Sequence, residues 1–134
     1  MTLMISGAAR GLGRYLHEQL GGVAVTRETN LHSLETPKQP YKAIVHCAFN
    51  MSRDVEDINL NGFLEDTIFL TRKLSKIPHE QFIFMSTIDV YPGNFDHCRE
   101  DMTINSWSLD TPYKIFKLSC ESIVRNLCSK FLIL

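Results

Sequence analysis

Short apolar runs alternate with amphipathic stretches along most of this chain. Short continuous apolar runs are typical of strands buried on both faces, whereas apolar residues three or four apart indicate helices. The pattern predicts strands at residues 2–6, 23–26, 43–48, 81–86 and 131–134. It predicts three helices, one that follows the glycine-rich residues 7–13 and ends at Gly21, one over 57–76 and one over 113–129. The polar residues 27–41 and 94–112 are expected to form loops, the second one a binding rim.

Strands that alternate with helices indicate βαβ units around a parallel sheet. The expected fold class is therefore α/β, a Rossmann-like doubly wound parallel sheet of about five strands in three α/β/α layers. We expect one domain over residues 1–134. A parallel strand needs cover on both faces, yet the chain finishes on the bare apolar residues 131–134. We therefore expect this chain to be the front part of a longer protein.

Composition and charge exclude several classes of protein. The 134 residues are 44% hydrophobic, which is enough for one globular core. With 14 basic against 15 acidic residues and no basic stripe, we expect no nucleic-acid partner. No apolar run approaches the ~20 residues of a membrane span. The four cysteines lie far apart, without a metal-ligand spacing, and no signal peptide is evident, so we expect no metal site and a cytoplasmic location.

Residues 6–13 read SGAARGLG and lie between the first expected strand and the first expected helix. Glycines at such a junction allow a tight turn, a close approach of a pyrophosphate to the backbone, and close packing of helix on strand. The helix N-terminus then offers N–H groups and the positive end of the helix dipole to the anion. The segment thus predicts a dinucleotide site, although three glycines in seven residues also fit a plain turn.

Hydroxyl, phenol and ammonium groups occur at two further places. Tyr113 and Lys117 share one helical face, and an ammonium beside a phenol favours the phenolate that a proton donor or acceptor to a sugar hydroxyl needs. The same spacing also arises by chance as a surface pair. Ser86 and Thr87 end a buried strand at the sheet edge where open α/β sheets bind ligands, but either hydroxyl equally well caps a turn. His46, within a buried strand, is interpreted as a hydrogen-bonded structural histidine.

Taken in order, these pieces resemble the extended short-chain dehydrogenase/reductases, the NAD(P)-dependent nucleotide-sugar epimerase, dehydratase and reductase group. The resemblance runs from Leu3 to Leu134. The matching pieces, in chain order, are SGAARGLG, IVHCAF, Asn59 with Gly62, FIFMSTIDVYPG, Glu100-Asp101, Pro112-Tyr113, Lys117 and Glu121.

The resemblance implies a role for each matched residue. Tyr113 would be the acid/base, Lys117 would favour its ionised form and hold the nicotinamide ribose, and Thr87 would be the catalytic hydroxyl. Gly7, Gly11 and Gly13 would line the pyrophosphate. The full set of expected cofactor contacts is Gly7, Arg10, Gly11, Leu12, Gly13, Thr26, Arg27, Ala48, Tyr113 and Lys117.

The chain departs from the family pattern in three ways. Its glycine spacing, G-x-x-x-G-x-G, is more typical of the non-extended branch and of deoxysugar reductases. Dehydratases carry two acids directly after the catalytic Thr, whereas Ile88 and Asp89 stand here, so we do not expect dehydration. Residues 27–43 are too few for the usual helix and third strand, so the adenine side of the sheet should be trimmed.

The choice of cofactor is argued from charge. Members that prefer NAD usually place a carboxylate at the end of the second strand to bind the ribose 2′-OH. Here that place reads Thr26-Arg27, and Arg10 lies in the nearby glycine loop. Two guanidiniums without a carboxylate suit a 2′-phosphate, so NADP(H) is favoured over NAD(H). The alternative is two solvated arginines.

These expectations combine into one function and one alternative. The resemblance implies an NAD(P)-dependent epimerase or reductase that acts, in full-length form, on a nucleotide-linked sugar through Thr87, Tyr113 and Lys117. The alternative is a non-catalytic or vestigial dinucleotide-binding module that lacks a substrate domain. The resemblance also implies a homodimer through helices 57–76 and 113–129.

Overall fold

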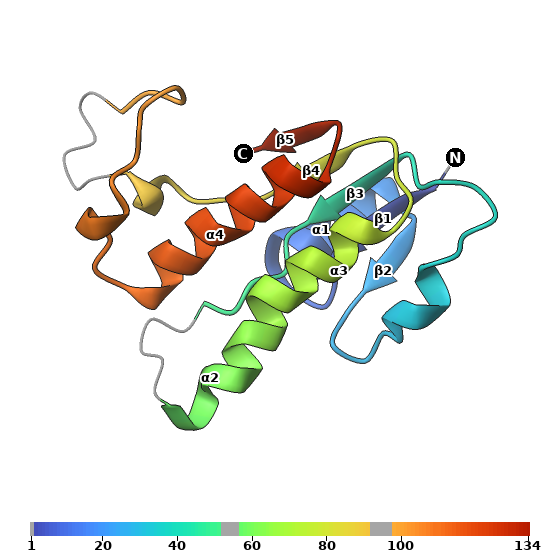
Figure 1. Cartoon of the computed structure of the whole chain (residues 1–134). Coiled ribbons are helices and arrows are strands. Elements are labelled where there is room, and N and C mark those ends of the chain that lie inside the picture. The colour runs from blue at the N-terminus through green and yellow to red at the C-terminus, as the bar shows by residue number, and fades with distance from the viewer. Residues whose placement is uncertain (1, 52–56, 92–97) are drawn as a thin grey trace.

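Five parallel strands form the sheet of the computed structural model, which describes residues 2–51, 57–91 and 98–134 (Figure 1). The strands are β1 (Leu3–Ser6), β2 (Val23–Val25), β3 (Ala43–His46), β4 (Phe82–Phe84) and β5 (Phe131–Ile133). Their order across the sheet is β2-β1-β3-β4-β5, and every neighbouring pair is parallel. The order reverses between β1 and β3, so the carboxyl ends of these two strands form the switch point of a doubly wound sheet.

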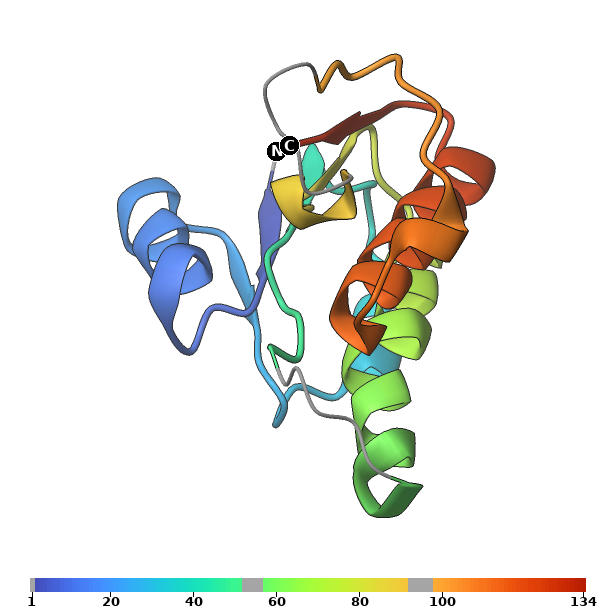
Figure 2. The same ribbon diagram turned by 90° about the vertical axis from the view of Figure 1, so that its left-hand side faces the viewer.

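Helices cover both faces of this sheet (Figure 2). The longer ones are α1 (Gly11–Leu20), α2 (Asp57–Leu64), the π-helical η2 (Glu65–Phe69), α3 (Leu70–Lys76) and α4 (Pro112–Leu127). Among the described residues, short 3-10 helices are η1 (Leu31–Leu34), η3 (Ile88–Val90) and η5 (Ser106–Ser108). Figure 2 shows α1 on one face and both α2–α3 and α4 on the other, which confirms the three-layer α/β/α prediction.

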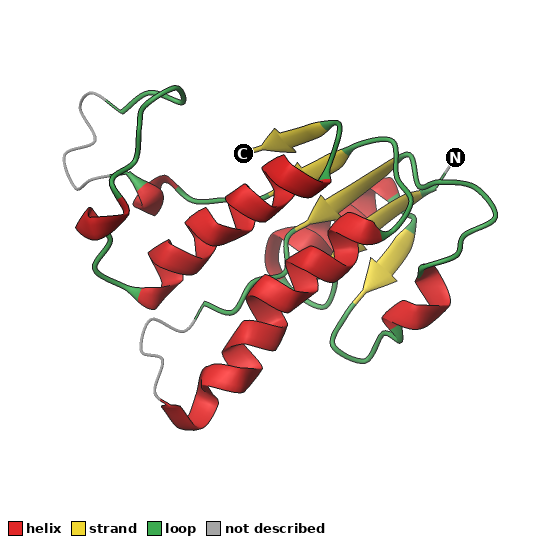
Figure 3. Ribbon diagram, viewed as in Figure 1, coloured by secondary structure: helices red, strands yellow, loops and turns green. Residues whose placement is uncertain are grey.

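The predicted helix over 57–76 is present, but its middle is π-helical. The segments α2, η2 and α3 follow one another as one continuous helix, without a break in the ribbon (Figure 3). A π segment inserts an extra residue into the turn, and such bulges occur often at functional sites. Here the π segment carries Asp66, which lines the cleft described below.

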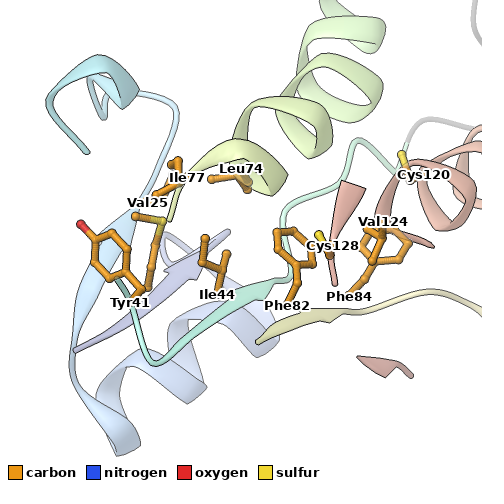
Figure 4. Close-up of a cluster of buried hydrophobic side chains, with 11 residues drawn as sticks. Val25, Tyr41, Ile44, Leu74, Ile77, Phe82, Phe84, Cys120, Val124 and Cys128 are labelled. Carbon is orange, nitrogen blue, oxygen red and sulfur yellow. The ribbon is translucent and has the colours of Figure 1, made fainter. Parts of the chain in front are cut away.

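The main core lies between the sheet and the pair α3–α4 (Figure 4). Strand residues Met4, Ile44, Phe82 and Phe84 are fully buried there and belong to the same cluster as Val124 of α4. The remaining members are Val25, Tyr41, Leu74, Ile77, Cys120 and Cys128. The apolar runs that predicted the strands thus supply the sheet side of the core, although each observed strand is shorter than its predicted run.

The two edges of the sheet differ. Beyond β2, the Thr26 amide donates to the Thr29 hydroxyl at 2.9 Å, and the chain turns into η1. Within the described residues no strand pairs outside β2, which confirms the trimmed adenine side. At the other edge, Leu132 of β5 and the following Leu134 are 43% and 60% exposed.

None of the described helices is long and apolar enough to cross a membrane.

Candidate functional site: a cleft at the switch point of the sheet

The glycine loop joins β1 to α1 and packs tightly against both. Gly7 and Gly11 have φ values of +74° and +58°, in the left-handed region that favours glycine. A Cβ on Gly13 would lie 2.5 Å from the Gly7 carbonyl oxygen, so only a glycine lets α1 approach the loop this closely. Arg10, which precedes α1, makes no side-chain cap. The first amides of α1 are therefore not satisfied by that side chain.

A cleft of about 830 Å³ opens beside this loop. Its walls come from the glycine loop, the turn after β2, the segment after β3, and the helix formed by η2 and α3. Five predicted cofactor contacts line it, namely Gly7, Arg10, Thr26, Arg27 and Ala48. Backbone left open by glycine, an uncapped helix N-terminus and a cleft of this volume together fit a dinucleotide. Of the other predicted contacts, Gly11, Leu12 and Gly13 form the start of α1, whereas Tyr113 and Lys117 lie on α4 and do not line this cleft.

Lys117 is a buried cation in the first half of α4, with 4% of its surface exposed. Its Nζ donates to the Met85 carbonyl at 2.5 Å and lies 4.2 Å and 4.9 Å from the ring centres of Phe49 and Phe84. Burial lowers the pKa of Lys117 to about 8 from 10.5. The ammonium is therefore held by one carbonyl and two aromatic faces, a combination that only partly replaces water.

Tyr113 lies one turn before Lys117 on the same helix and is 9% exposed. Its ring meets the Phe49 ring edge-on, with centroids 5.5 Å apart and planes at 88°. Phe49 itself lines the cleft, so the phenol and the ammonium contact one shared wall residue. The structure thereby connects α4 to the cleft, and it does so through a residue that the sequence analysis did not single out.

The two hydroxyls after β4 have different partners. Ser86 Oγ donates to Glu121 Oε1 at 2.5 Å, and Glu121 is 7% exposed. Thr87 Oγ1 accepts the Asp89 amide at 3.2 Å and so caps η3, as the turn-capping interpretation predicts. That contact uses a lone pair of Thr87 and leaves its proton to donate elsewhere. The 3-10 helix η3, which Thr87 caps, packs against α4.

His46 is fully buried and hydrogen-bonded on both ring nitrogens, which confirms its structural interpretation. Nδ1 lies 2.7 Å from Ser6 Oγ, and Nε2 lies 2.9 Å from Thr71 Oγ1. Burial, aided by the charge of Lys117, lowers the pKa of His46 to about 3. The ring is therefore neutral at ordinary pH, and both of its nitrogens are engaged in hydrogen bonds.

The charge argument for NADP(H) needs a correction. Arg27 Nη2 lies 2.6 Å from Asp66 Oδ2, and Glu28 and Glu35 also line the cleft. The premise that no carboxylate accompanies the two arginines is therefore wrong. Glu28 directly follows Arg27 in the sequence, whereas Asp66 comes from the distant π segment, which only the tertiary fold brings to the end of β2.

The sequence analysis missed two residues of this site, whereas the contact between two others could have been predicted from the sequence. Nothing in the sequence marks Phe49 or the Met85 carbonyl as partners of Lys117. By contrast, Ser6 and His46 pair in register as the last residues of β1 and β3, so two polar residues ending adjacent buried runs signal their contact.

Residues 94–97 of the expected binding rim lie outside the described residues. No group of three or more His, Cys, Asp or Glu side chains that could hold a metal ion occurs in the described part of the chain.

Comparisons with known proteins point to one family. The profile of the NAD dependent epimerase/dehydratase family matches residues 3–133. Among solved structures, MoeE5 in complex with UDP-glucose and NAD aligns with a TM-score of 0.77 and 17% identity, over 99% of this chain and 52% of its own. The UDP-glucuronic acid 4-epimerase from Bacillus cereus, in complex with UDP-glucuronic acid and NAD, gives 0.77 and 18%, over 99% and 55%.

A reductase gives a similar result. The dTDP-4-dehydrorhamnose reductase from Bacillus anthracis, in complex with NADP, aligns with a TM-score of 0.77 and 19% identity, over 98% of this chain and 51% of its own. The chain thus spans about half the length of these structures. A comparison with curated protein sequences gives no significant match.

Proposed function

Because this chain belongs to the NAD-dependent epimerase/dehydratase family, we propose that it is the dinucleotide-binding core of an NAD(P)-dependent epimerase or reductase of nucleotide-linked sugars. The observation that carries the proposal is the cleft between the glycine loop and Phe49, whose ring contacts both Tyr113 and Lys117. The solved neighbours with UDP-sugars, NAD or NADP support it.

In this proposal the nicotinamide ring supplies the hydride chemistry, and the chain supplies proton transfer and positioning. Tyr113 exchanges a proton between its phenol oxygen and the oxygen of the reacting sugar carbon. Lys117 places a positive charge on the same helical face as the phenol and would hold the nicotinamide ribose. Thr87 donates its hydroxyl proton to the same sugar oxygen while its lone pair keeps the Asp89 amide. Epimerisation and reduction use the same three groups.

The proposal includes NADP(H) as the favoured cofactor, through Arg10 and Arg27. A 2′-phosphate would bind Arg27 in competition with Asp66, which accepts a hydrogen bond from it at 2.6 Å. We therefore expect Asp66→Asn to strengthen NADPH binding more than NADH binding. Arg27→Ala should weaken NADPH binding alone. Arg14→Ala is the matched control, because Arg14 also carries an exposed ion pair, with Glu18, but does not line the cleft.

The test is a thermal-melt titration of this chain with NADPH and NADH. Ligand at ~100 times its dissociation constant adds about 2.7 kcal/mol, which is several degrees for a domain of this size. A larger shift with NADPH, reduced by Arg27→Ala and not by Arg14→Ala, supports both parts of the proposal. A larger shift with NADH overturns the NADP(H) preference. A cooperative melt that neither cofactor shifts overturns dinucleotide binding.

One alternative function has an observation in its favour. The chain spans only 52–55% of the first neighbours, and a module of this extent can bind a dinucleotide without turning over a sugar. Turnover separates the two readings. In a form that converts a nucleotide-linked sugar, Tyr113→Phe should lower kcat by about 10²-fold or more. Unchanged turnover in that variant would remove Tyr113 from the mechanism.

The proposal also includes a cytoplasmic homodimer through the helices over 57–76 and 113–129. Phe69 and Ile115, one on each helix, expose 41% and 43% of their surface, as a self-association face requires. Sedimentation over a range of concentrations tests this. A dimer that Phe69→Glu dissociates supports it, and a monomer at all concentrations contradicts it.

A further inference from the structure

The buried polar groups around His46 form one connected chain of hydrogen bonds. The Ala48 amide donates to Ser6 Oγ at 3.2 Å, and Ser6 Oγ contacts His46 Nδ1 at 2.7 Å. On the other side of the ring, His46 Nε2 contacts Thr71 Oγ1 at 2.9 Å. Thr71 Oγ1 in turn donates to the Thr67 carbonyl at 2.8 Å. The chain therefore runs from the segment after β3, through β1 and β3, into the helix that contains η2 and α3.

Counting protons along this chain fixes its direction. The Thr67 carbonyl, 2.8 Å from Thr71 Oγ1, can only accept and is a nearer and stronger acceptor than Cys120 Sγ at 3.3 Å, so we assign the single hydroxyl proton of Thr71 to it. Thr71 Oγ1 must then accept from His46 Nε2, which carries the ring proton. His46 Nδ1 is left as an acceptor for the Ser6 hydroxyl, and Ser6 Oγ keeps a lone pair for the Ala48 amide. Each proton is used once, and no polar side-chain atom buried in the described residues lacks a partner.

The far end of this chain is part of the cleft. A Cβ on Gly7 would lie 2.9 Å from the Ala48 nitrogen, so the 48–49 segment passes directly against the glycine loop. The next residue, Phe49, lines the cleft and contacts the side chains of Tyr113 and Lys117. The bond between Ser6 and the Ala48 amide therefore holds the backbone that separates the glycine loop from α4.

We propose that His46 is a positioning residue, locked as the neutral Nε2–H tautomer, which orients the Ser6 hydroxyl and thereby fixes the 48–49 segment between the glycine loop and Lys117. In the opposite tautomer, Nδ1 would donate to Ser6 Oγ. The Ser6 proton would then point away from Nδ1 and toward the Ala48 N–H, which donates to the same oxygen. The link to cofactor binding rests on the proposed function, whereas the tautomer and the fixed segment do not.

The first test is nitrogen-15 NMR of the histidine rings in the cofactor-free chain between pH 5 and 8. His46 should show a proton on Nε2 and a bare Nδ1, without change over this range. His32, whose side chain is 87% exposed, serves as the internal control for a histidine ring outside the core. A proton on Nδ1 of His46, or a titration of this ring, overturns the proposal without any variant having to fold.

The second test compares two buried serine substitutions. Ser6→Ala removes the hydroxyl that links His46 to Ala48. Ser75→Ala removes a hydroxyl that donates to the Thr71 carbonyl on the same helix and does not belong to this chain of bonds. We expect Ser6→Ala to speed amide exchange of Ala48 about tenfold and to move the Nδ1 resonance of His46, with neither effect in Ser75→Ala. Equal effects in both variants, or none in Ser6→Ala, overturn the proposal. Absence of NADPH binding by the wild type would leave these results standing and would count against the proposed function alone.

Discussion

Replacing Gly13 by alanine should reduce stability, although alanine is the better helix former. The new Cβ would lie 2.5 Å and 2.7 Å from the carbonyl oxygen and carbon of Gly7, and 2.9 Å from the Ser6 oxygen. All three are backbone atoms, so no flexible side chain can move aside. The closest approach is about 0.9 Å short of the 3.4 Å at which ordinary contact begins. Either the start of α1 or the glycine loop must shift.

The magnitude follows from two opposing effects. Overpacking of this kind costs about 1–3 kcal/mol. Alanine gains about 1 kcal/mol over glycine inside a helix, which offsets part of that cost. The free energy of unfolding of Gly13→Ala should therefore fall by up to about 2 kcal/mol. At about 3–5 °C per kcal/mol for a domain of this size, Tm should drop by up to roughly 10 °C.

Gly62→Ala is the matched control for this prediction. Gly62 is exposed within α2, and its Cβ would meet no described atom within 4 Å. The same substitution there should raise stability by about 1 kcal/mol, because only the helix propensity changes. Urea unfolding of both variants measures the two values. If Gly13→Ala were as stable as Gly62→Ala, the close approach of α1 to the glycine loop would be wrong.

Three other outcomes are expected from urea unfolding. Since the pKa of Lys117 falls to about 8 from 10.5, the unfolded chain binds a proton that the folded chain has lost between these values. Wild-type stability should therefore rise by about 3 kcal/mol relative to Lys117→Met as pH increases from 8 to 10.5, and a pH-independent difference would refute this. Glu121→Leu, which leaves Ser86 without its acceptor, should cost about 2 kcal/mol and Glu121→Gln clearly less, so equal losses would contradict a role for this hydrogen bond. Phe82→Ala should cost about 3–5 kcal/mol, whereas Ile88→Ala, at a side chain 68% exposed, should stay within about 0.5 kcal/mol; similar values would show that the core is placed wrongly.

The strands could be predicted because burial on both faces removes polar residues from them. Residues 43–46 and 82–84 are apolar apart from His46, and they form the centre of the sheet with β1. The order of matched motifs also located the cleft, since Gly7, Arg10 and Ala48 line it. Local sequence carries this information because a turn, a helix start and a strand end are each set by neighbouring residues.

The partners of the charged groups could not be predicted in the same way. Asp66 reaches Arg27 across 39 positions of sequence, and its direction depends on the π turn in the middle of a helix that looked regular. Phe49 contacts Tyr113 only after α4 has packed beside α3 on the sheet. Both contacts arise from the packing of whole elements, and no periodicity in either segment encodes them.

Lys117 and His46 are both buried polar residues, but their environments have different consequences. His46 has a hydrogen-bond partner on each ring nitrogen and is neutral, so its burial carries no charge into the core. Lys117 is charged at neutral pH and has a carbonyl and two aromatic rings in place of water, so a methionine of similar shape would serve the core at least as well. A buried charge with incomplete compensation lowers stability, and such a group beside a cleft is the kind of residue that catalysis requires. For this reason the function of the site is better sought at Lys117 and its neighbour Tyr113 than at the equally buried histidine.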